Sequence, residues 1–279
     1  MQIFDDIPQE KVNFYSAEML AVYASQPDKY SVETDYFSGT IKTADRYDQE
    51  IAANNQNSIL SIRFGFRTKV RGDLALAVWM PDLQRASEDE FAKWHGFFGQ
   101  PDTLIERPDA RFDMWVERYL NGRWGVENGA IARTREQVLN LNSLTVSAVG
   151  KPLFKSSDLP GVCFPIAQNN HKYHDAHSEL YMVLIDGLNK DAMKALGERL
   201  AVPLKGAANR KPLKLLEELF PNSSLKGLYV ISRNRRLAAH GERPAAQGLD
   251  AFERFNADLN GVIEALRGIA SDLQARLKA

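Results

Sequence analysis

The first half of the chain alternates apolar and polar residues with a period of two. Residues 60–66 place Leu, Ile and Phe at every second position, and a second apolar run over 74–80 follows the short polar stretch 69–73. Because the side chains of a strand point alternately to its two faces, this pair predicts an antiparallel hairpin. Residues 144–149 alternate in the same way and predict another strand.

Helical patterns begin between these strands and dominate the second half. Ser87, followed three residues later by Glu90, forms a capping-box pattern that predicts a short helix. Further helices are expected over 174–204 with a break near 187–190, over 212–220, and in the segment that ends by Gly241.

The last helix has the most regular pattern in the chain. Its apolar residues recur at alternating steps of three and four, at Phe252, Phe255, Leu259, Val262, Leu266, Ile269 and Leu273. Such a seven-residue repeat packs against another helix, either in the same bundle or in a second copy of the chain.

A change of composition divides the chain near its middle. Residues 150–170 contain three prolines, Pro152, Pro160 and Pro165, and two glycines. We therefore predict an α+β protein. Residues 1–160 form a mixed α/β domain with antiparallel strands and no assigned role, and residues 161–279 form an all-α helical bundle.

Composition narrows the functional classes. Among the 279 residues, Lys and Arg number 35 against 36 Asp and Glu, which argues against a basic coat over the whole surface but allows a local basic patch. The single cysteine excludes a disulfide framework within the chain. No apolar run approaches the ~18 residues of a membrane helix, and the acidic start lacks the basic region of a secretion signal. We expect a cytoplasmic protein with no membrane partner.

The four tryptophans allow two interpretations. They are Trp79, Trp94, Trp115 and Trp124, all in the first half of the chain. A shared aromatic core is favoured. A stacking surface for bases would instead need exposed rings beside basic residues such as Arg118 and Arg123.

The stretch from Ser232 to Gly241 gathers the residues best suited to phosphate chemistry. Arg grips a phosphate with a planar fork of donors, and His can exchange a proton near neutral pH. On a regular helix Arg233 and His240, seven residues apart, lie within about 20° of each other. Arg236 shares their face and Arg235 points about 140° from His240. If the last turn unwinds near Gly241, Arg235 can take part instead.

This motif resembles the HEPN superfamily of helical ribonucleases and nucleotide-binding domains. Their pattern is an Arg, usually followed by a polar residue, then His after four to six intervening residues. Arg233-Asn234 and His240 have six residues between them, whereas Arg235 and His240 have four but lack the polar residue. The resemblance covers residues 170–279.

The resemblance implies a metal-independent endoribonuclease that needs no cofactor and acts as a homodimer through its helical domain. His240 would act on the attacking 2′-hydroxyl or the leaving oxygen. Arg233 and Arg236 would hold the phosphate, and Asn234 would orient the site. Arg235 and Arg243 would bind the RNA backbone. Many such proteins are toxins or antiviral-defence effectors, which implies an antitoxin or regulatory partner.

Two other interpretations compete with the ribonuclease. The arginines and His240 can simply complement the negative C-terminal end of their helix. A dimeric, non-catalytic module could also present the same arginines to RNA or a nucleotide without cleaving it. Loss of His240 separates the two functions, because binding tolerates that loss and catalysis does not.

A second histidine group, His171, His174 and His177, raises the question of a metal site. Imidazole is a common metal ligand, and Asp175 or Glu179 could contribute. On a helix these positions spread over about 120°, which is too wide for all three to reach one ion easily, although two of them could bind it with a ligand from elsewhere. A polar start of a helix is therefore favoured, and a metal-dependent hydrolase lacks a motif such as His-Glu-x-x-His. His174 or His177 could alternatively face the arginine stretch.

Overall fold

The structure is a computed structural model of the chain. It describes residues 11–47, 49, 60–106, 108–123, 129–159, 161–165, 170–204, 206, 209–240 and 250–278. Within these ranges, the side chains at 101, 170–172, 238–240 and 250 are not described. The chain divides into two compact units, the first over Met1–Glu127 and the second over Asn128–Pro165 and Asn169–Ala279.

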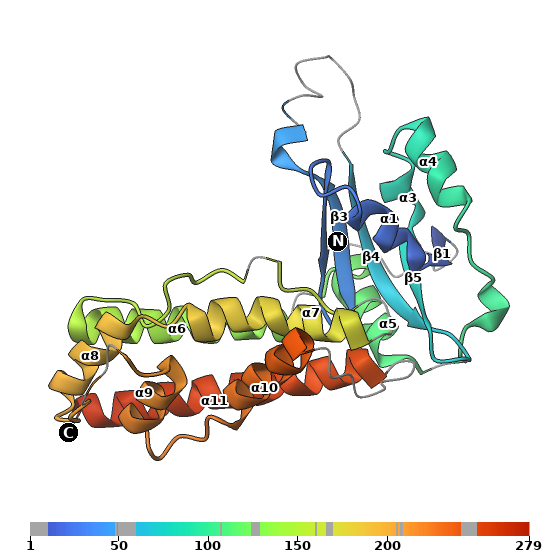
Figure 1. Ribbon diagram of the computed structural model, residues 1–279. Helices are drawn as coiled ribbons and strands as arrows, with labels where there is room; N and C mark the ends of the chain where they lie inside the picture. The colour runs from blue at the N-terminus through green and yellow to red at the C-terminus, as the bar shows by residue number, and fades with distance from the viewer. Residues whose placement is uncertain are drawn as a thin grey trace. The chain divides into compact units, whose positions relative to one another are not determined.

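The first unit contains a five-stranded antiparallel sheet with strand order β1-β5-β4-β3-β2 (Figure 1). Its strands are β1 (Val12–Ser16), β2 (Tyr30–Thr34), β3 (Ser38–Thr43), β4 (Ser61–Thr68) and β5 (Leu74–Trp79). The predicted hairpin is confirmed, because β4 pairs with β5 in a register that sets Thr68 opposite Leu74.

Short helices accompany the sheet. They are α1 (Glu18–Ala24), α3 (Met80–Leu83), α4 (Glu88–His95), the 3₁₀ turn η2 (Pro101–Thr103), α5 (Ala110–Trp115) and the π-helical turn η3 (Val116–Leu120). The predicted start of α4 is confirmed, since Ser87 Oγ accepts a hydrogen bond from Glu90 N at 3.3 Å. The side chain of Glu90, however, bonds to Tyr23, Tyr30 and Lys93.

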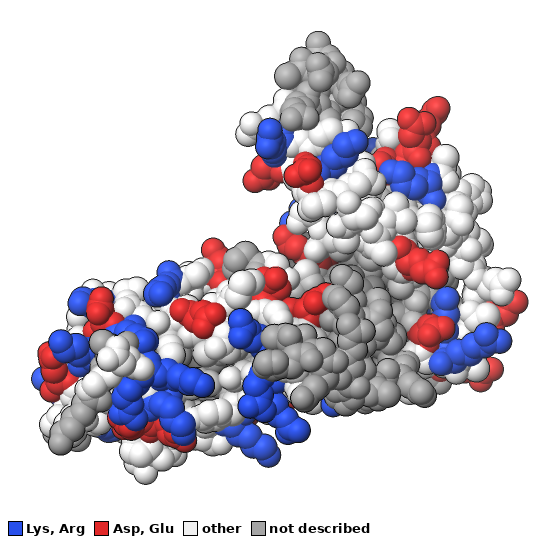
Figure 2. All heavy atoms as spheres, viewed as in Figure 1, with Lys and Arg blue, Asp and Glu red and all other residues white. Residues whose placement is uncertain are grey.

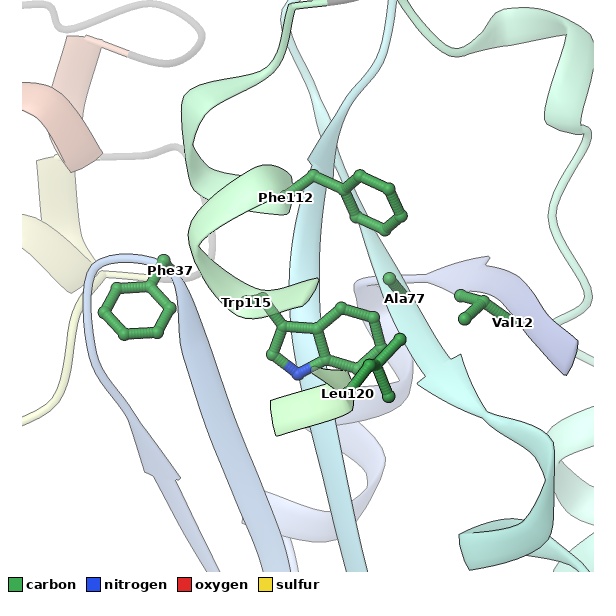
Figure 3. Close-up of a cluster of buried hydrophobic side chains, with 6 residues drawn as sticks. All are labelled: Val12, Phe37, Ala77, Phe112, Trp115 and Leu120. Carbon is green, nitrogen blue, oxygen red and sulfur yellow. The ribbon is translucent and has the colours of Figure 1, made fainter. Parts of the chain in front are cut away.

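Aromatic side chains from α5 pack closely on the sheet (Figure 3). Trp115 lies directly over Gly65, where an added Cβ would come within 2.4 Å of the indole, so only glycine allows this approach. Trp94 is also fully buried, which favours the shared-core interpretation for these two tryptophans. Trp79 is half-buried, and Trp124 lies outside the described residues.

The second unit is helical, and the fold is therefore of the α+β class. Its elements are α6 (Ala130–Val149), α7 (Asn170–Tyr181) with the π-helical turn η4 (Met182–Asp186), α8 (Lys190–Arg199), α9 (Pro212–Leu219), α10 (Lys226–His240) and α11 (Asp250–Lys278). The long helix α11 packs against α6 and α10, and α10 packs against α7 (Figure 1). The predicted break near 187–190 and the helix that begins at Pro212 are both confirmed.

The predicted strand over 144–149 is wrong, because these residues end helix α6. The buried positions of α6 follow a helical period, at Ala130, Ile131, Thr134, Val138, Leu141 and Thr145. Thr145 donates its hydroxyl to the carbonyl of Leu141, four residues earlier. Six alternating residues read alone could not distinguish this face from a strand, and packing against α11 overrides the β-propensity of the branched residues.

The helical unit begins about 30 residues before the expected boundary at residue 160. The start of the proline-rich segment (residues 150–170) is hydrogen-bonded to α6. Asn142 accepts a hydrogen bond from Phe154 N at 2.7 Å and donates one to Phe154 O at 3.1 Å. Phe154 and Leu153 are fully buried, so their apolar side chains assign the segment to the bundle.

The seven-residue repeat of α11 is satisfied inside this unit. All of its apolar positions are fully buried: Phe252, Phe255, Leu259, Val262, Leu266, Ile269 and Leu273. Of the two arrangements that the pattern allows, the repeat therefore packs against helices of its own bundle, and it does not provide the face for a second copy.

Candidate functional site

Helix α10 contains most of the arginine stretch (Ser232 to Gly241) and packs against the other helices of the bundle. Its buried face runs through Gly227, Leu228 and Ile231 at helical spacing, and half-buried Asn234 continues the same line. Gly227 lets α10 approach α11 closely, since a Cβ there would lie 2.2 Å from the carbonyl oxygen of Gly261. The apolar line therefore fixes which side of α10 faces outward.

Arg233, Arg235 and Arg236 of α10 are all exposed. The helix is continuous through His240, so the backbone positions of Arg233, Arg236 and His240 follow one face, as regular helical geometry requires. The side chain of His240 is not described, and Arg243 lies outside the described residues. Lys and Arg side chains gather over α9 and α10 in the space-filling view (Figure 2).

Arg235 belongs to a different side of the helix. Its guanidinium carbon lies 4.8 Å from the centre of the Tyr181 ring on α7, a cation–π contact. Since α10 stays helical to His240, the described chain contains no unwound turn that would bring Arg235 to the face of His240. Arg235 instead joins α10 to α7.

Asn234 points inward, into a polar cluster between α7, α10 and α11. Its Nδ2 donates to Tyr173 Oη at 3.2 Å and lies 3.0 Å from His177 Nε2. His177 therefore meets the arginine stretch through Asn234, which is the arrangement that the sequence left open for this histidine.

Asp258 of α11 completes this cluster. Its Oδ2 accepts a hydrogen bond from Tyr173 Oη at 2.5 Å and lies 3.0 Å from His177 Nε2. The His177 side chain is 0% exposed, while that of Asp258 is 20% exposed. Burial, and then the hydrogen bond to Asp258, raise the pKa of Tyr173, so its hydroxyl stays protonated as a donor. We call Tyr173, His177, Asn234 and Asp258 the interhelical network.

The histidine run lies at the start of helix α7, as predicted, but two of its members are buried. His174 is 3% exposed and its ring lies 5.4 Å from that of Tyr173, and His177 belongs to the interhelical network. Among the described residues, no three His, Cys, Asp or Glu side chains are placed to hold a metal ion. The His171 side chain lies outside that set.

Sequence reasoning missed Tyr173 and Asp258. Two patterns could have found the interhelical network. Asn234 continues the apolar line of Leu228 and Ile231, which places a polar residue on a buried face. Asp258 borders the seven-residue repeat between Phe255 and Leu259. Both patterns mark a polar group directed into a core, where hydrogen-bond partners are required.

The fold and the site together define an α+β protein whose helical bundle exposes arginines beside a buried polar network. Comparisons with protein-family models, with curated proteins and with solved structures found no match. In the part of the chain that the structure describes, no helix is both long enough and apolar enough to cross a membrane.

Proposed function

We propose that the protein is a metal-independent endoribonuclease of the HEPN type, with its active site on the outward face of α10. The observation that carries the proposal is the continuous helix from Lys226 to His240, which exposes Arg233 and Arg236 on the line of His240 and turns Asn234 inward. One helix thus offers two phosphate-binding side chains and a proton-transfer group in a fixed order.

The roles of the residues follow from their chemistry. His240 takes the proton of a ribose 2′-hydroxyl, or gives one to the leaving oxygen, at the pH where imidazole exchanges protons. The 2′-oxygen attacks phosphorus and the bond to the 5′-oxygen breaks, which leaves a 2′,3′-cyclic phosphate and a 5′-hydroxyl. Arg233 and Arg236 hold the phosphate and stabilise the charge that develops on it. Arg235 and Arg243 bind the adjacent backbone.

The wider setting is part of the same proposal. The enzyme acts in the cytoplasm as a homodimer of the helical unit, in toxin or antiviral-defence chemistry held in check by an antitoxin or regulatory partner. Because the apolar repeat of α11 is buried within the unit, the dimer forms through another surface of the bundle.

The proposal is tested by RNA cleavage in excess EDTA. Native protein, His240→Ala and Arg233→Ala are compared, with His95→Ala on α4 and Arg267→Ala on α11 as matched controls at exposed positions. Native protein and both controls should produce 2′,3′-cyclic phosphate ends, while His240→Ala loses cleavage and retains RNA binding.

Equal cleavage by native protein and His240→Ala would defeat the proposal. Absence of cleavage by native protein, at any protein concentration and with or without divalent metal, would also defeat it. RNA binding that needs the arginines and not His240 would then identify a non-catalytic module.

A further inference from the structure

The interhelical network ties three helices together at one point. Tyr173 and His177 come from α7, Asp258 from α11 and Asn234 from α10, and the polar contacts among them lie between 2.5 and 3.2 Å. In addition, His177 Nδ1 lies 2.8 Å from the carbonyl oxygen of Tyr173. Within the described part of α10, Asn234 is the residue that hydrogen-bonds to this cluster, and it lies between Arg233 and Arg235 in the sequence.

The hydrogen-bond roles at His177 follow from the chemistry of its neighbours. A carbonyl oxygen only accepts, so Nδ1 carries a hydrogen and donates to Tyr173 O. The other ring nitrogen, Nε2, faces both Asp258 Oδ2 and Asn234 Nδ2 at 3.0 Å. With a hydrogen, Nε2 donates to the carboxylate; without one, it accepts from the amide. In either form the ring links α7 to a neighbouring helix.

Tyr173 orders the network from its other side. Its hydroxyl donates its one hydrogen to Asp258 and accepts from Asn234, so a single oxygen connects α11 to α10. Arg254 covers the ring, with its guanidinium carbon 5.4 Å from the ring centre. Removing this oxygen alone would release Asn234 from the hydroxyl and leave the aromatic packing in place.

Folding alone gives little reason for such a cluster. Burying a carboxylate, an imidazole and an amide costs more than apolar side chains of similar volume, unless every group is satisfied. Polar networks of this kind do specify one arrangement among several that apolar packing tolerates. Here the network fixes how α10 is rotated about its own axis at Asn234, the residue next to Arg233.

We propose that Tyr173, His177 and Asp258 are positioning residues for the α10 site. Through Asn234 they hold the rotation and register of α10, and thereby the alignment of Arg233, Arg236 and His240 on one phosphate. This inference rests on the proposed ribonuclease function. Misplacement of a catalytic group by about 1 Å costs about 100-fold in rate, so loss of one contact should be seen mainly in the chemical step.

The test compares Tyr173→Phe and Asp258→Asn with two matched controls in the full chain. Tyr229→Phe removes a hydroxyl on α10 that bonds to exposed Glu217, and Glu264→Gln neutralises an exposed carboxylate on α11. For the network variants we expect kcat for RNA cleavage to fall about 10- to 100-fold. KM and RNA affinity should stay within about twofold, and both controls should match the native protein.

A second measurement does not depend on activity. Backbone amide hydrogen exchange in folded protein should become faster over residues 232–240 in Tyr173→Phe, and remain unchanged over 226–231 and in the controls. Unchanged exchange over 232–240 would overturn the inference, as would faster exchange with unchanged kcat. Persistent cleavage by His240→Ala would instead defeat the proposed function, while the exchange result still reports whether the network holds α10.

Discussion

Each unit of the protein contains a carboxylate that accepts hydrogen bonds from tyrosine hydroxyls, but the two carboxylates connect different things. In the first unit, Glu90 of α4 accepts from Tyr23 of α1 and, at 2.8 Å, from Tyr30 of β2. In the second unit, Asp258 of α11 accepts from Tyr173 and contacts His177 of α7. Both clusters join elements that are distant in the sequence.

In the cluster around Glu90, the polar side chains bond to one another. Lys93, one turn later on the same helix, donates to Glu90 at 2.7 Å, and its ammonium lies 5.3 Å from the centre of the Tyr23 ring. Trp94 Nε1 donates to Tyr23 Oη at 2.9 Å. Burial acts to raise the pKa of Glu90, but the hydrogen bonds from Lys93, Tyr23 and Tyr30 outweigh it and the pKa is lowered.

The cluster around Asp258 instead leads outward through Asn234 to the exposed arginines of α10. A buried polar cluster indicates a functional role when one of its members adjoins exposed reactive groups along the chain, as Asn234 adjoins Arg233 and Arg235. Glu90 stabilises the packing of the sheet and its helices. Asp258 lies in a cluster whose outer end is the proposed active site.

We expect the largest loss of stability from a substitution in the helical unit. Gly227→Ala places a Cβ about where the backbone of Gly261 already lies, at 2.2 Å from its carbonyl oxygen. We expect a loss of about 3 kcal/mol in the free energy of unfolding, at the upper end of the cost of overpacking. Urea unfolding followed by circular dichroism measures it.

Gly268→Ala on α11 is the matched control for that substitution, because its Cβ would meet Ser223 only at an ordinary 3.9 Å. Alanine is favoured over glycine inside a helix, so this variant should gain up to about 1 kcal/mol. A Gly227→Ala protein as stable as Gly268→Ala would contradict the close crossing of α10 and α11.

The second prediction removes the charge of each carboxylate in turn, Glu90 in the first unit and Asp258 in the second. Glu90→Gln and Asp258→Asn should each lower the free energy of unfolding by about 1–3 kcal/mol, because each removes a charge that accepts hydrogen bonds. Only Asp258→Asn should also lower kcat for RNA cleavage. Equal loss of cleavage in both variants would show that the effect is one of general stability.

The third prediction concerns pH. A carboxylate with a lowered pKa stabilises the folded state fully above its unfolded value, here 4.5, and this contribution is lost as the pH falls through the folded pKa. Urea unfolding of native protein and Glu90→Gln between pH 7 and pH 3 should therefore show two curves that converge at acid pH. Parallel curves over this range would contradict the lowered pKa.

The smallest expected effect concerns the contact between α10 and α7. Arg235→Ala removes the cation–π contact with Tyr181 and should cost about 0.5–1 kcal/mol. Arg267→Ala, an exposed arginine paired with Glu264 on α11, should cost less than that because exposed ion pairs contribute little. The difference between the two thermal unfolding midpoints measures the contact.

Several elements followed from local pattern alone. The β4–β5 hairpin, the cap at Ser87, the helix at Pro212 and the apolar face of α11 each depend on the residues of one short segment, so they could be predicted without knowledge of the fold. The order of Arg233, Arg236 and His240 on one face of α10 is of the same kind, because it follows from the geometry of a single regular helix.

Other features of the protein depend on contacts between segments that are distant in the sequence. The alternation over 144–149 suits a strand, yet packing against α11 makes it the end of α6. The composition of the proline-rich segment predicts a domain boundary, yet Phe154 and Leu153 are buried in the helical bundle. Asp258 and Tyr173 are 85 positions apart along the chain, and a hydrogen bond joins them because α7 and α11 pack together. The sequence determined which groups α10 presents, and tertiary packing decided which groups hold it in place.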